Sequence, residues 1–305
     1  MKLKGIVVPV GTPVDRNERI DEPGLRRFTR YLLDNGVHGI LANGSMGGFA
    51  HLEDREQMRA VEIILDEVSG RVPVIANVGE NGTRRALRRA RELELLNPDY
   101  LAVLPPFYFL MTQKDLKHFY GEMANEVRTP VFLYNNPVTT KVDLEFETIV
   151  ALSEHPNVIG VKESKQDFDK WMRMVRHFQG SGFSILIGTD LQVSAALTMG
   201  CDGVVAGLSN LCPQTASQLY DAVCTGDEAE AEALQERIIN LFSIFDIDDA
   251  WGSFEVALQH LGICEKVTVS PFRSITDPAV RKRVEEIVDT NLKLPYASLK
   301  REGEA

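Results

Sequence analysis

The sequence alternates eight times between a short, mostly β-branched apolar run and a longer segment with helical periodicity. The runs, all expected to be buried strands, are Gly5–Val10, Val37–Ala42, Val72–Asn77, Tyr100–Leu104, Val131–Tyr134, Asn157–Ser164, Phe183–Ile187 and Gly203–Ala206. Continuous apolar strands separated by helices are typical of parallel sheets covered on both faces. Eight such units with short connections predict an α/β fold, the closed (β/α)8 TIM barrel.

An open doubly wound sheet is the competing α/β fold. It usually carries a GxGxxG turn after its first strand, whereas Gly11-Thr-Pro-Val follows the first strand here. We therefore expect a barrel catalytic domain over residues 1–225 and a C-terminal helical region over residues 226–305, packed on the barrel. The helical patterns in that region are Asp227–Phe245, Ser253–Leu261 and Pro278–Leu292. The charged tail, Lys300–Ala305, is expected to fray.

The charge and the apolar runs exclude several classes of partner. The net charge of −11 argues against binding to nucleic acid or to an anionic membrane surface. No apolar run reaches 18 residues, so we expect no membrane span. The N-terminus resembles a first strand more than a signal peptide, which favours the cytoplasm. The basic run from Arg84 to Arg91 is expected to be a solvated helix face, with a subunit contact as the alternative.

The cysteines and histidines do not form a pattern of metal ligands. The four cysteines include no CxxC pair and no histidine cluster accompanies them, so they are expected to be buried thiols. We expect neither a metal nor a cofactor.

The sixth strand ends on a lysine, Lys162. A lysine held partly inside a barrel tends to lose its proton, and a neutral amine is a nucleophile that forms Schiff bases with carbonyl compounds. A strand-end lysine can also extend its ammonium to solvent, and this stretch by itself favours that interpretation.

The ends of the other strands supply groups that suit Schiff-base chemistry. Chemistry in this fold lies at the C-terminal ends of the strands. Tyr134 ends the fifth strand and can pass protons. Backbone N–H groups and the Ser45 hydroxyl, in the glycine-rich loop after the second strand, can hold a carboxylate. Gly188-Thr-Asp190 and the loop from Gly207 add further polar groups. The set indicates a reaction on a 2-keto acid.

Four motifs in this order and spacing resemble the dihydrodipicolinate synthase/N-acetylneuraminate lyase family. They are Gly44-Ser-Met-Gly-Gly, Tyr134-Asn-Asn-Pro, Gly160-Val-Lys-Glu-Ser and Gly188-Thr-Asp. The resemblance implies a barrel with a C-terminal helical region, a homotetramer built from dimers, and lysine-imine chemistry on pyruvate or a related 2-keto acid.

The resemblance also implies roles for individual residues. Lys162 is the imine-forming lysine, Tyr134 the proton relay and Ser45 the first hydroxyl of the carboxylate loop. Tyr108 matches the tyrosine that a neighbouring subunit inserts into the site. The expected substrate-binding residues are Gly44, Ser45, Met46, Thr189, Asp190 and Gly207.

Four departures from the family pattern bear on the substrate. Met46 replaces a second hydroxyl and Gly48 a glutamate. Thr139 stands where dihydrodipicolinate synthases carry an arginine, and Leu191 where N-acetylneuraminate lyases carry an acid. We therefore expect a class I aldolase-type lyase that cleaves or condenses a 2-keto-3-deoxy acid. Dihydrodipicolinate synthesis, dehydration of a 2-keto-3-deoxy sugar acid, a metal-dependent barrel aldolase and a 2-keto acid binding protein without turnover are the alternatives.

Overall fold

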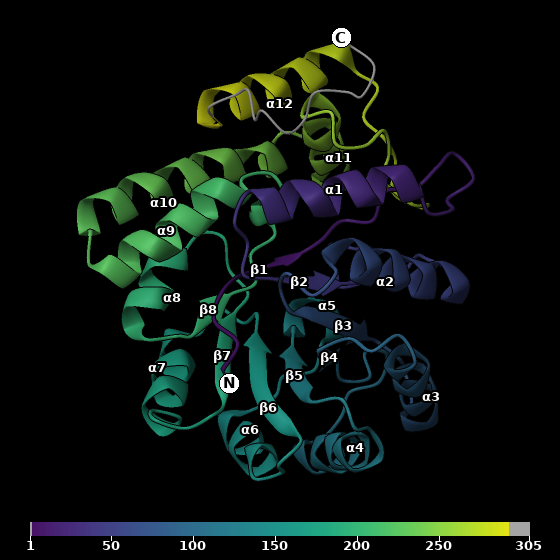
Figure 1. Cartoon of the computed structure of the whole chain (residues 1–305), viewed down its shortest axis with the longest axis vertical. Helices are drawn as coiled ribbons and strands as arrows, with labels where there is room; N and C mark the ends of the chain where they lie inside the picture. The colour runs from purple at the N-terminus through teal and green to yellow at the C-terminus, as the bar shows by residue number, and fades with distance from the viewer. Residues whose placement is uncertain (1, 293–305) are drawn as a thin grey trace.

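The computed structural model describes residues 2–292 and contains a closed barrel of eight parallel strands (Figure 1). Each strand pairs with its neighbours in chain order, and β8 closes the barrel against β1. The strands are β1 Gly5–Pro9, β2 Gly39–Ala42, β3 Val74–Val78, β4 Tyr100–Val103, β5 Val131–Asn135, β6 Val158–Glu163, β7 Ser184–Ile187 and β8 Gly203–Val204. The predicted (β/α)8 barrel with a C-terminal helical extension is confirmed.

Helices surround the barrel and cover its outer face (Figure 1). They are α1 Glu22–Asp34, α2 Asp54–Val68, α3 Thr83–Glu94, α4 Gln113–Glu126, α6 Phe146–Ser153, α7 Phe168–His177, α8 Val193–Met199 and α9 Pro213–Thr225. Two short elements had no counterpart in the predicted pattern, α5 Pro137–Thr140 and the 3-10 turn η1 Leu208–Asn210. Proline at the first position of α5 suits a helix start, because the N–H that it lacks would be unpaired there.

Strand alternation divides the core into two apolar layers. The inner layer fills the barrel with side chains such as those of Leu41, Phe132 and Leu186. The outer layer lies between strands and helices. Because successive side chains point to opposite faces, a residue's position along a strand decides which layer it joins.

An irregularity in β6 decides which side chains of that strand face inward. Val131 pairs with Val158, but Phe132 pairs with Gly160, so Ile159 is an extra residue on β6. Gly160 is required here, because a Cβ at this position would lie 2.3 Å from the Phe132 ring. After this bulge Val161 joins the outer layer, and the alternation turns the following Lys162 into the barrel.

The C-terminal helices pack beside α8 and α9 (Figure 1). They are α10 Glu228–Phe242, the 3-10 turn η2 Ser243–Asp246, α11 Ala250–His260 and α12 Pro278–Asn291. The ring of Phe254, on α11, packs closely against Gly11 in the loop after β1. A Cβ added to Gly11 would lie 3.1 Å from this ring. The predicted tail, Lys300–Ala305, lies outside the described residues.

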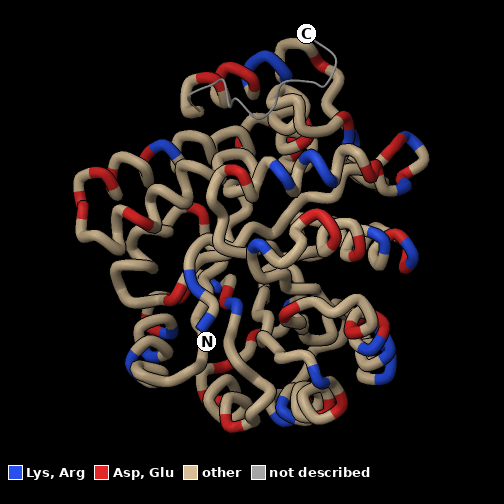
Figure 2. The backbone as a smooth tube through the Cα atoms, in the orientation of Figure 1, with Lys and Arg blue, Asp and Glu red and all other residues tan. Residues whose placement is uncertain are grey.

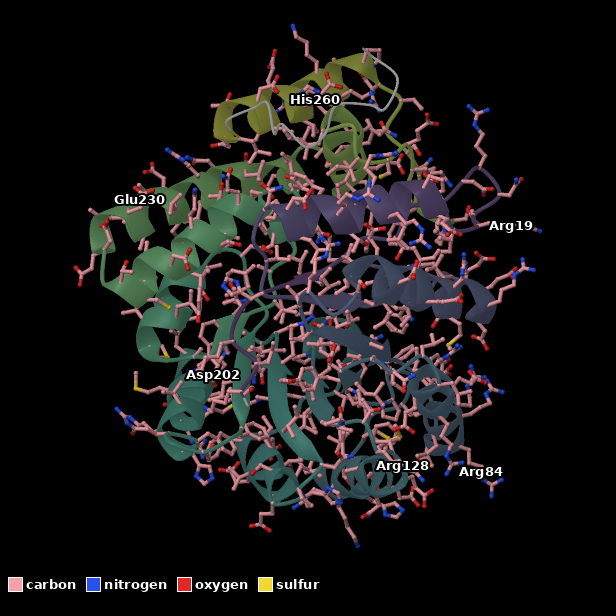
Figure 3. All side chains as sticks on the ribbon, viewed as in Figure 1. Arg19, Arg84, Arg128, Asp202, Glu230 and His260 are labelled. Atoms are coloured by element: carbon pink, nitrogen blue, oxygen red, sulfur yellow. The ribbon has the colours of Figure 1, made fainter. Side chains whose placement is uncertain are left out.

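The surface charges are mixed, with acidic and basic residues interspersed over the outer helices (Figure 2). Arg84 and Arg128 are both exposed on the surface (Figure 3). The expectation that the whole basic run is solvated is wrong at Arg89, which is 2% exposed and pairs with Asp54 at 2.5 Å. Arg89 lies on the side of α3 that faces α2. A guanidinium buried there requires an opposite charge, which Asp54 supplies.

Two further sequence expectations can be compared with the described residues. Cys201, Cys212 and Cys264 are buried as expected, whereas Cys224 is exposed near the end of α9. No helix within residues 2–292 combines the length and the apolar character that a membrane crossing requires.

Candidate active site

Lys162 and Tyr134 meet inside the barrel, on neighbouring strands. They are register partners of β6 and β5, and the Lys162 Nζ donates to the Tyr134 Oη over 2.7 Å. The same Nζ lies 3.9 Å from the centre of the Tyr134 ring. Lys162 is 6% exposed and Tyr134 1% exposed. The structure therefore brings the predicted nucleophile and the predicted proton relay into direct contact, away from bulk water.

Ser45 extends this contact to the loop after β2. Its Oγ lies 3.1 Å from the Tyr134 Oη, so the three side chains form a chain of hydrogen bonds. Burial opposes ionisation of the Tyr134 phenol, but the adjacent Lys162 ammonium and the bonds from Lys162 and Ser45 outweigh burial and lower its pKa below 10.0. A phenol that ionises more readily is better suited to exchanging protons near neutral pH.

The glycine-rich loop brings Met46 close to Gly207. A Cβ on Gly207 would lie 3.5 Å from the Met46 Sδ and 3.4 Å from Asp190 Oδ2. Gly44, Ser45, Met46, Asp190 and Gly207 therefore lie around the same mouth as Lys162. Met46 presents an apolar thioether where a hydroxyl would offer hydrogen bonds.

Asp190 holds the loop after β8. Its carboxylate accepts the N–H of Leu208 at 2.7 Å and that of Gly207 at 3.2 Å. Burial raises the pKa of Asp190 to about 6, while these two N–H donors and the nearby Lys162 act in the opposite direction. Because both carboxylate oxygens already accept backbone N–H groups, Asp190 shapes the mouth through Gly207 as well as through its charge.

The remaining predicted residues occupy two different environments. Thr189 is buried beside Asp190, after β7. Tyr108 is 79% exposed on the loop after β4, and its ring packs edge-on against exposed Phe109 at 5.0 Å. Tyr108 is thus the one predicted site residue that the single chain places on its surface. Thr139 and Leu191 are both exposed and uncharged.

Sequence reasoning did not single out Asn77, a polar residue inside the barrel. It shares the inward face of β3 with Ile75 and is 1% exposed. Within residues 2–292 neither amide atom of Asn77 has a hydrogen-bond partner. The sequence does show a polar residue near the end of an otherwise apolar strand. It does not show that the Asn77 side chain points into the barrel, because that depends on how the barrel closes.

Gln235 of α10 was also missed. Its Nε2 donates to the Asp190 carbonyl at 3.0 Å, and its Oε1 accepts the Ser194 N–H at 2.9 Å. Nothing in the local pattern of α10 marks a residue that reaches a loop some forty positions earlier.

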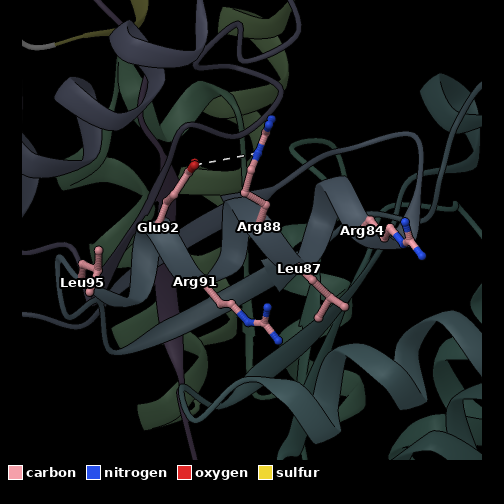
Figure 4. Close-up of a pocket in the computed structure, with 6 residues that line it drawn as sticks. All are labelled: Arg84, Leu87, Arg88, Arg91, Glu92 and Leu95. Atoms are coloured by element: carbon pink, nitrogen blue, oxygen red, sulfur yellow. Dashed lines mark ion pairs between the residues drawn. The ribbon is translucent and has the colours of Figure 1, made fainter.

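A groove elsewhere on the surface is formed by α3 alone. It is lined by Arg84, Leu87, Arg88, Arg91, Glu92 and Leu95 (Figure 4). Two of these residues, Arg88 and Glu92, form an ion pair at 3.8 Å on the same side of the helix (Figure 4). All its lining residues belong to the outer helix or the residue that follows it, so the groove is separate from the Lys162 site. The described part of the chain, residues 2–292, contains no group of three or more His, Cys, Asp or Glu able to hold a metal ion.

A closed barrel that places a buried lysine, a tyrosine and a glycine-rich loop at the C-terminal ends of its strands has the groups that Schiff-base chemistry requires. The family model described as the Dihydrodipicolinate synthetase family matches residues 2–290. The chain therefore belongs to the dihydrodipicolinate synthetase family and is a lyase of that family.

Similar sequences and solved structures agree with this assignment. The 4-hydroxy-tetrahydrodipicolinate synthase of Syntrophus aciditrophicus is 34% identical over 89% of this chain and 93% of its own length. The Nitrobacter hamburgensis protein of the same name is 31% identical over 91% of this chain and 93% of its own.

Some of the similar structures, including the following two, contain bound small molecules. A dihydrodipicolinate synthase from Acinetobacter baumannii, complexed with pyruvate, superposes with a TM-score of 0.89 at 25% identity and covers 95% of this chain and 99% of its own. The Clostridium difficile protein CdNal, in complex with mannosamine, gives a TM-score of 0.90 at 26% identity and covers 96% and 100%.

Proposed function

We propose that this protein is a class I aldolase-type lyase in which Lys162 forms a Schiff base with pyruvate or a related 2-keto acid. In this proposal it cleaves or condenses a 2-keto-3-deoxy acid. The observation that carries the proposal is the buried contact between the Lys162 Nζ and the Tyr134 Oη, 2.7 Å apart. The similarity to a pyruvate-bound synthase supports the choice of keto acid.

The side chains present suffice for the chemistry. The Lys162 Nζ, once it has released its proton, attacks C2 of the keto acid, and the carbonyl oxygen leaves as water, which gives the imine. When the C3–C4 bond of the substrate breaks, its electron pair moves into the imine to give an enamine, and the C4 fragment leaves as an aldehyde. Protonation at C3 and hydrolysis of the imine then release pyruvate and restore Lys162. Tyr134, bonded to Ser45 as well, moves the protons that these steps require. Such a cycle needs neither a metal nor a cofactor.

Different loops at the mouth are proposed to contact different parts of the substrate. Gly44, Ser45 and Met46 are proposed to hold the carboxylate through backbone N–H groups and the Ser45 hydroxyl. Thr189 and Asp190 follow β7, and Gly207 follows β8 beside Met46; these three residues are proposed to contact the remainder of the molecule. Exposed, uncharged Thr139 and Leu191 favour a partner fragment without a second carboxylate or a long sugar tail.

Borohydride trapping tests the proposal directly. The protein is incubated with pyruvate and sodium borohydride and then analysed by peptide mass spectrometry. We expect a reduced pyruvyl adduct on Lys162 in the native protein and no adduct in Lys162→Arg. A panel of 2-keto-3-deoxy acids, with pyruvate release as readout, then separates an active lyase from a keto-acid binding protein. The absence of any adduct on Lys162 would remove the mechanism.

Dihydrodipicolinate synthesis from pyruvate and aspartate semialdehyde is the second candidate. The names of relatives with 30% identity or more over most of the chain favour it. Thr139 argues against it, because a threonine cannot form the charge-assisted bonds that an arginine makes to a substrate carboxylate. Turnover of aspartate semialdehyde at a rate above that of every 2-keto-3-deoxy acid would favour this candidate.

We also propose a homotetramer, built from dimers, that functions in the cytoplasm, with residues 1–225 and 226–305 as barrel and helical region. Tyr108, Phe109 and Leu110 are each at least 75% exposed and adjacent in sequence. Large apolar side chains exposed together on a stiff loop are typical of a subunit contact.

A further inference from the structure

A cluster of charged side chains, of which Glu163 and Lys170 are buried, lies behind the reacting pair, on the outer side of the same two strands. Tyr134 and Lys162 are register partners, and the next register pair is Asn135 and Glu163. Because side chains alternate along a strand, the first pair points into the barrel and the second points outward. We name the outward group the outer cluster. It comprises Asn135, Asp143, Glu163, Lys165 and Lys170.

One amide in this cluster joins β5 to β6. The Asn135 Nδ2 lies 2.8 Å and 2.9 Å from the two carboxylate oxygens of Glu163. The Asn135 Oδ1 accepts the N–H of Leu144, before α6, at 3.0 Å. Asn135 and Glu163 are both fully buried. The bonds therefore connect the two reactive strands without competition from solvent.

Two lysines pair with the two carboxylates of the outer cluster. Lys170 of α7 contacts Glu163 at 2.7 Å and Asp143 at 3.2 Å, and its Nζ also donates to the Leu144 carbonyl. Lys165 pairs with Asp143 at 2.8 Å. Buried ion pairs add little net stability compared with well-packed apolar side chains, so stability alone does not account for the buried Glu163–Lys170 pair.

The register of β5 and β6 is the property that this cluster can control. The hydrogen-bond ladder between these strands is interrupted near their N-terminal ends, where Ile159 bulges from β6. A slip of one residue would turn Lys162 out of the barrel, because inward and outward positions alternate. The Asn135–Glu163 bonds lie at the opposite end of the ladder from the bulge, beside the Tyr134–Lys162 pair.

We propose that Asn135 and Glu163 are positioning residues that hold β5 and β6 in register, so that the Lys162 Nζ remains within hydrogen-bond distance of the Tyr134 Oη. Lys170 compensates the buried charge of Glu163, and Lys165 pairs with Asp143. This inference rests on the proposed role of Lys162.

The test compares Glu163→Gln with a control at a second buried glutamate. Glu255 of α11 is 1% exposed and accepts bonds from Val267 and Thr268, outside the reactive strands. The readouts are kcat, KM, the pH profile of borohydride trapping with pyruvate and the midpoint of thermal unfolding. Activities are measured at a temperature at which every variant is folded.

We expect Glu163→Gln to lower kcat and the trapping rate by about 10²-fold, with a shifted pH profile and a nearly unchanged KM, because small misplacements of reacting groups have effects of this size. Glu255→Gln should reduce the unfolding midpoint but keep the native kcat and pH profile. A folded Glu163→Gln variant with native kcat and pH profile would overturn the inference, as would equal losses of kcat in both variants.

A double variant covers the case in which Glu163→Gln does not fold. Glu163→Gln/Lys170→Gln removes the unpaired ammonium along with the carboxylate. We expect this double variant to fold and to retain the loss of kcat, because the amide of the new glutamine at position 163 offers Asn135 only one acceptor oxygen. Native kcat in this variant would count against the inference. Borohydride trapping by the native protein tests the proposed function separately from the positioning role. Failure of native trapping would reject Lys162 chemistry, whereas native trapping with unaffected variants would reject only the positioning role.

Discussion

The Gln235 side chain, on α10 of the C-terminal extension, donates to the backbone carbonyl of Asp190 at the mouth of the barrel, over 3.0 Å. Its Oε1 also accepts the N–H of Ser194, in the first turn of α8, where helical N–H groups have no partner within the helix. The extension thus supports a loop of the candidate site, so its contribution extends beyond covering the barrel.

Replacing Gln235 is expected to affect both stability and the site. Gln235→Ala leaves two polar backbone groups unpaired, which lowers the free energy of unfolding by about 1–3 kcal/mol. Gln235→Glu is the matched comparison, because its carboxylate can accept from Ser194 but cannot donate to Asp190. Chemical denaturation and kcat/KM are measured for both. Equal kcat/KM in the native protein and both variants would show that the extension does not support the site.

Tyr134→Phe is expected to reduce kcat by about 10²–10⁴-fold while the barrel stays folded, because the variant keeps the ring and loses only the proton-transferring hydroxyl. Tyr120→Phe is the control. Tyr120 is equally buried, but its hydroxyl donates to the Val103 carbonyl at 2.9 Å, within the outer layer. We expect Tyr120→Phe to lose stability and keep turnover. Near-native kcat in folded Tyr134→Phe would exclude the proton relay.

Asp190 predicts a pH-dependent term in stability. Burial raises its pKa from the ordinary 3.8 to about 6, so between these values the folded chain holds a proton that the unfolded chain has released. Its contribution to the free energy of unfolding therefore falls as the pH rises from about 4 to 6, and is constant above that range. The free energy of unfolding of the native protein, relative to that of Asp190→Asn, should fall across this window in denaturation experiments. A difference independent of pH would contradict the raised pKa.

Tyr108 predicts a dependence of activity on assembly. If its ring crosses a subunit interface, Tyr108→Ala should weaken association and reduce kcat, with little change in the stability of the separated chain, since the exposed ring contacts little of its own subunit. Light scattering and sedimentation over a range of protein concentrations measure the assembly. Arg128→Ala, at another exposed position, serves as the control. A fully active monomer would contradict this role.

The order of strands and helices was predictable because each βα unit carries its own pattern of apolar runs and helical periodicity. The barrel rule then brings strand ends together, which is why Lys162, Tyr134 and Ser45 could be placed at one mouth. The bulge at Ile159 and the burial of Arg89 could not be predicted in this way. Each depends on a partner far along the chain, Phe132 for the bulge and Asp54 for Arg89. The local periodicity of apolar residues contains no information about such distant partners.

Thr139→Arg is the most direct test of the second candidate function. Thr139 is exposed in α5, close in sequence to Tyr134, so an arginine can be accommodated without disturbing the core. A guanidinium there can form two charge-assisted bonds to a carboxylate, worth about 1.5–3 kcal/mol. We expect kcat/KM for aspartate semialdehyde to rise by about 10- to 100-fold, and the pyruvate trapping rate to stay unchanged. Thr139→Lys, which keeps the charge without the planar fork, should gain less. If the native protein already condenses aspartate semialdehyde efficiently and Thr139→Arg adds nothing, the assignment to smaller 2-keto-3-deoxy acids is wrong.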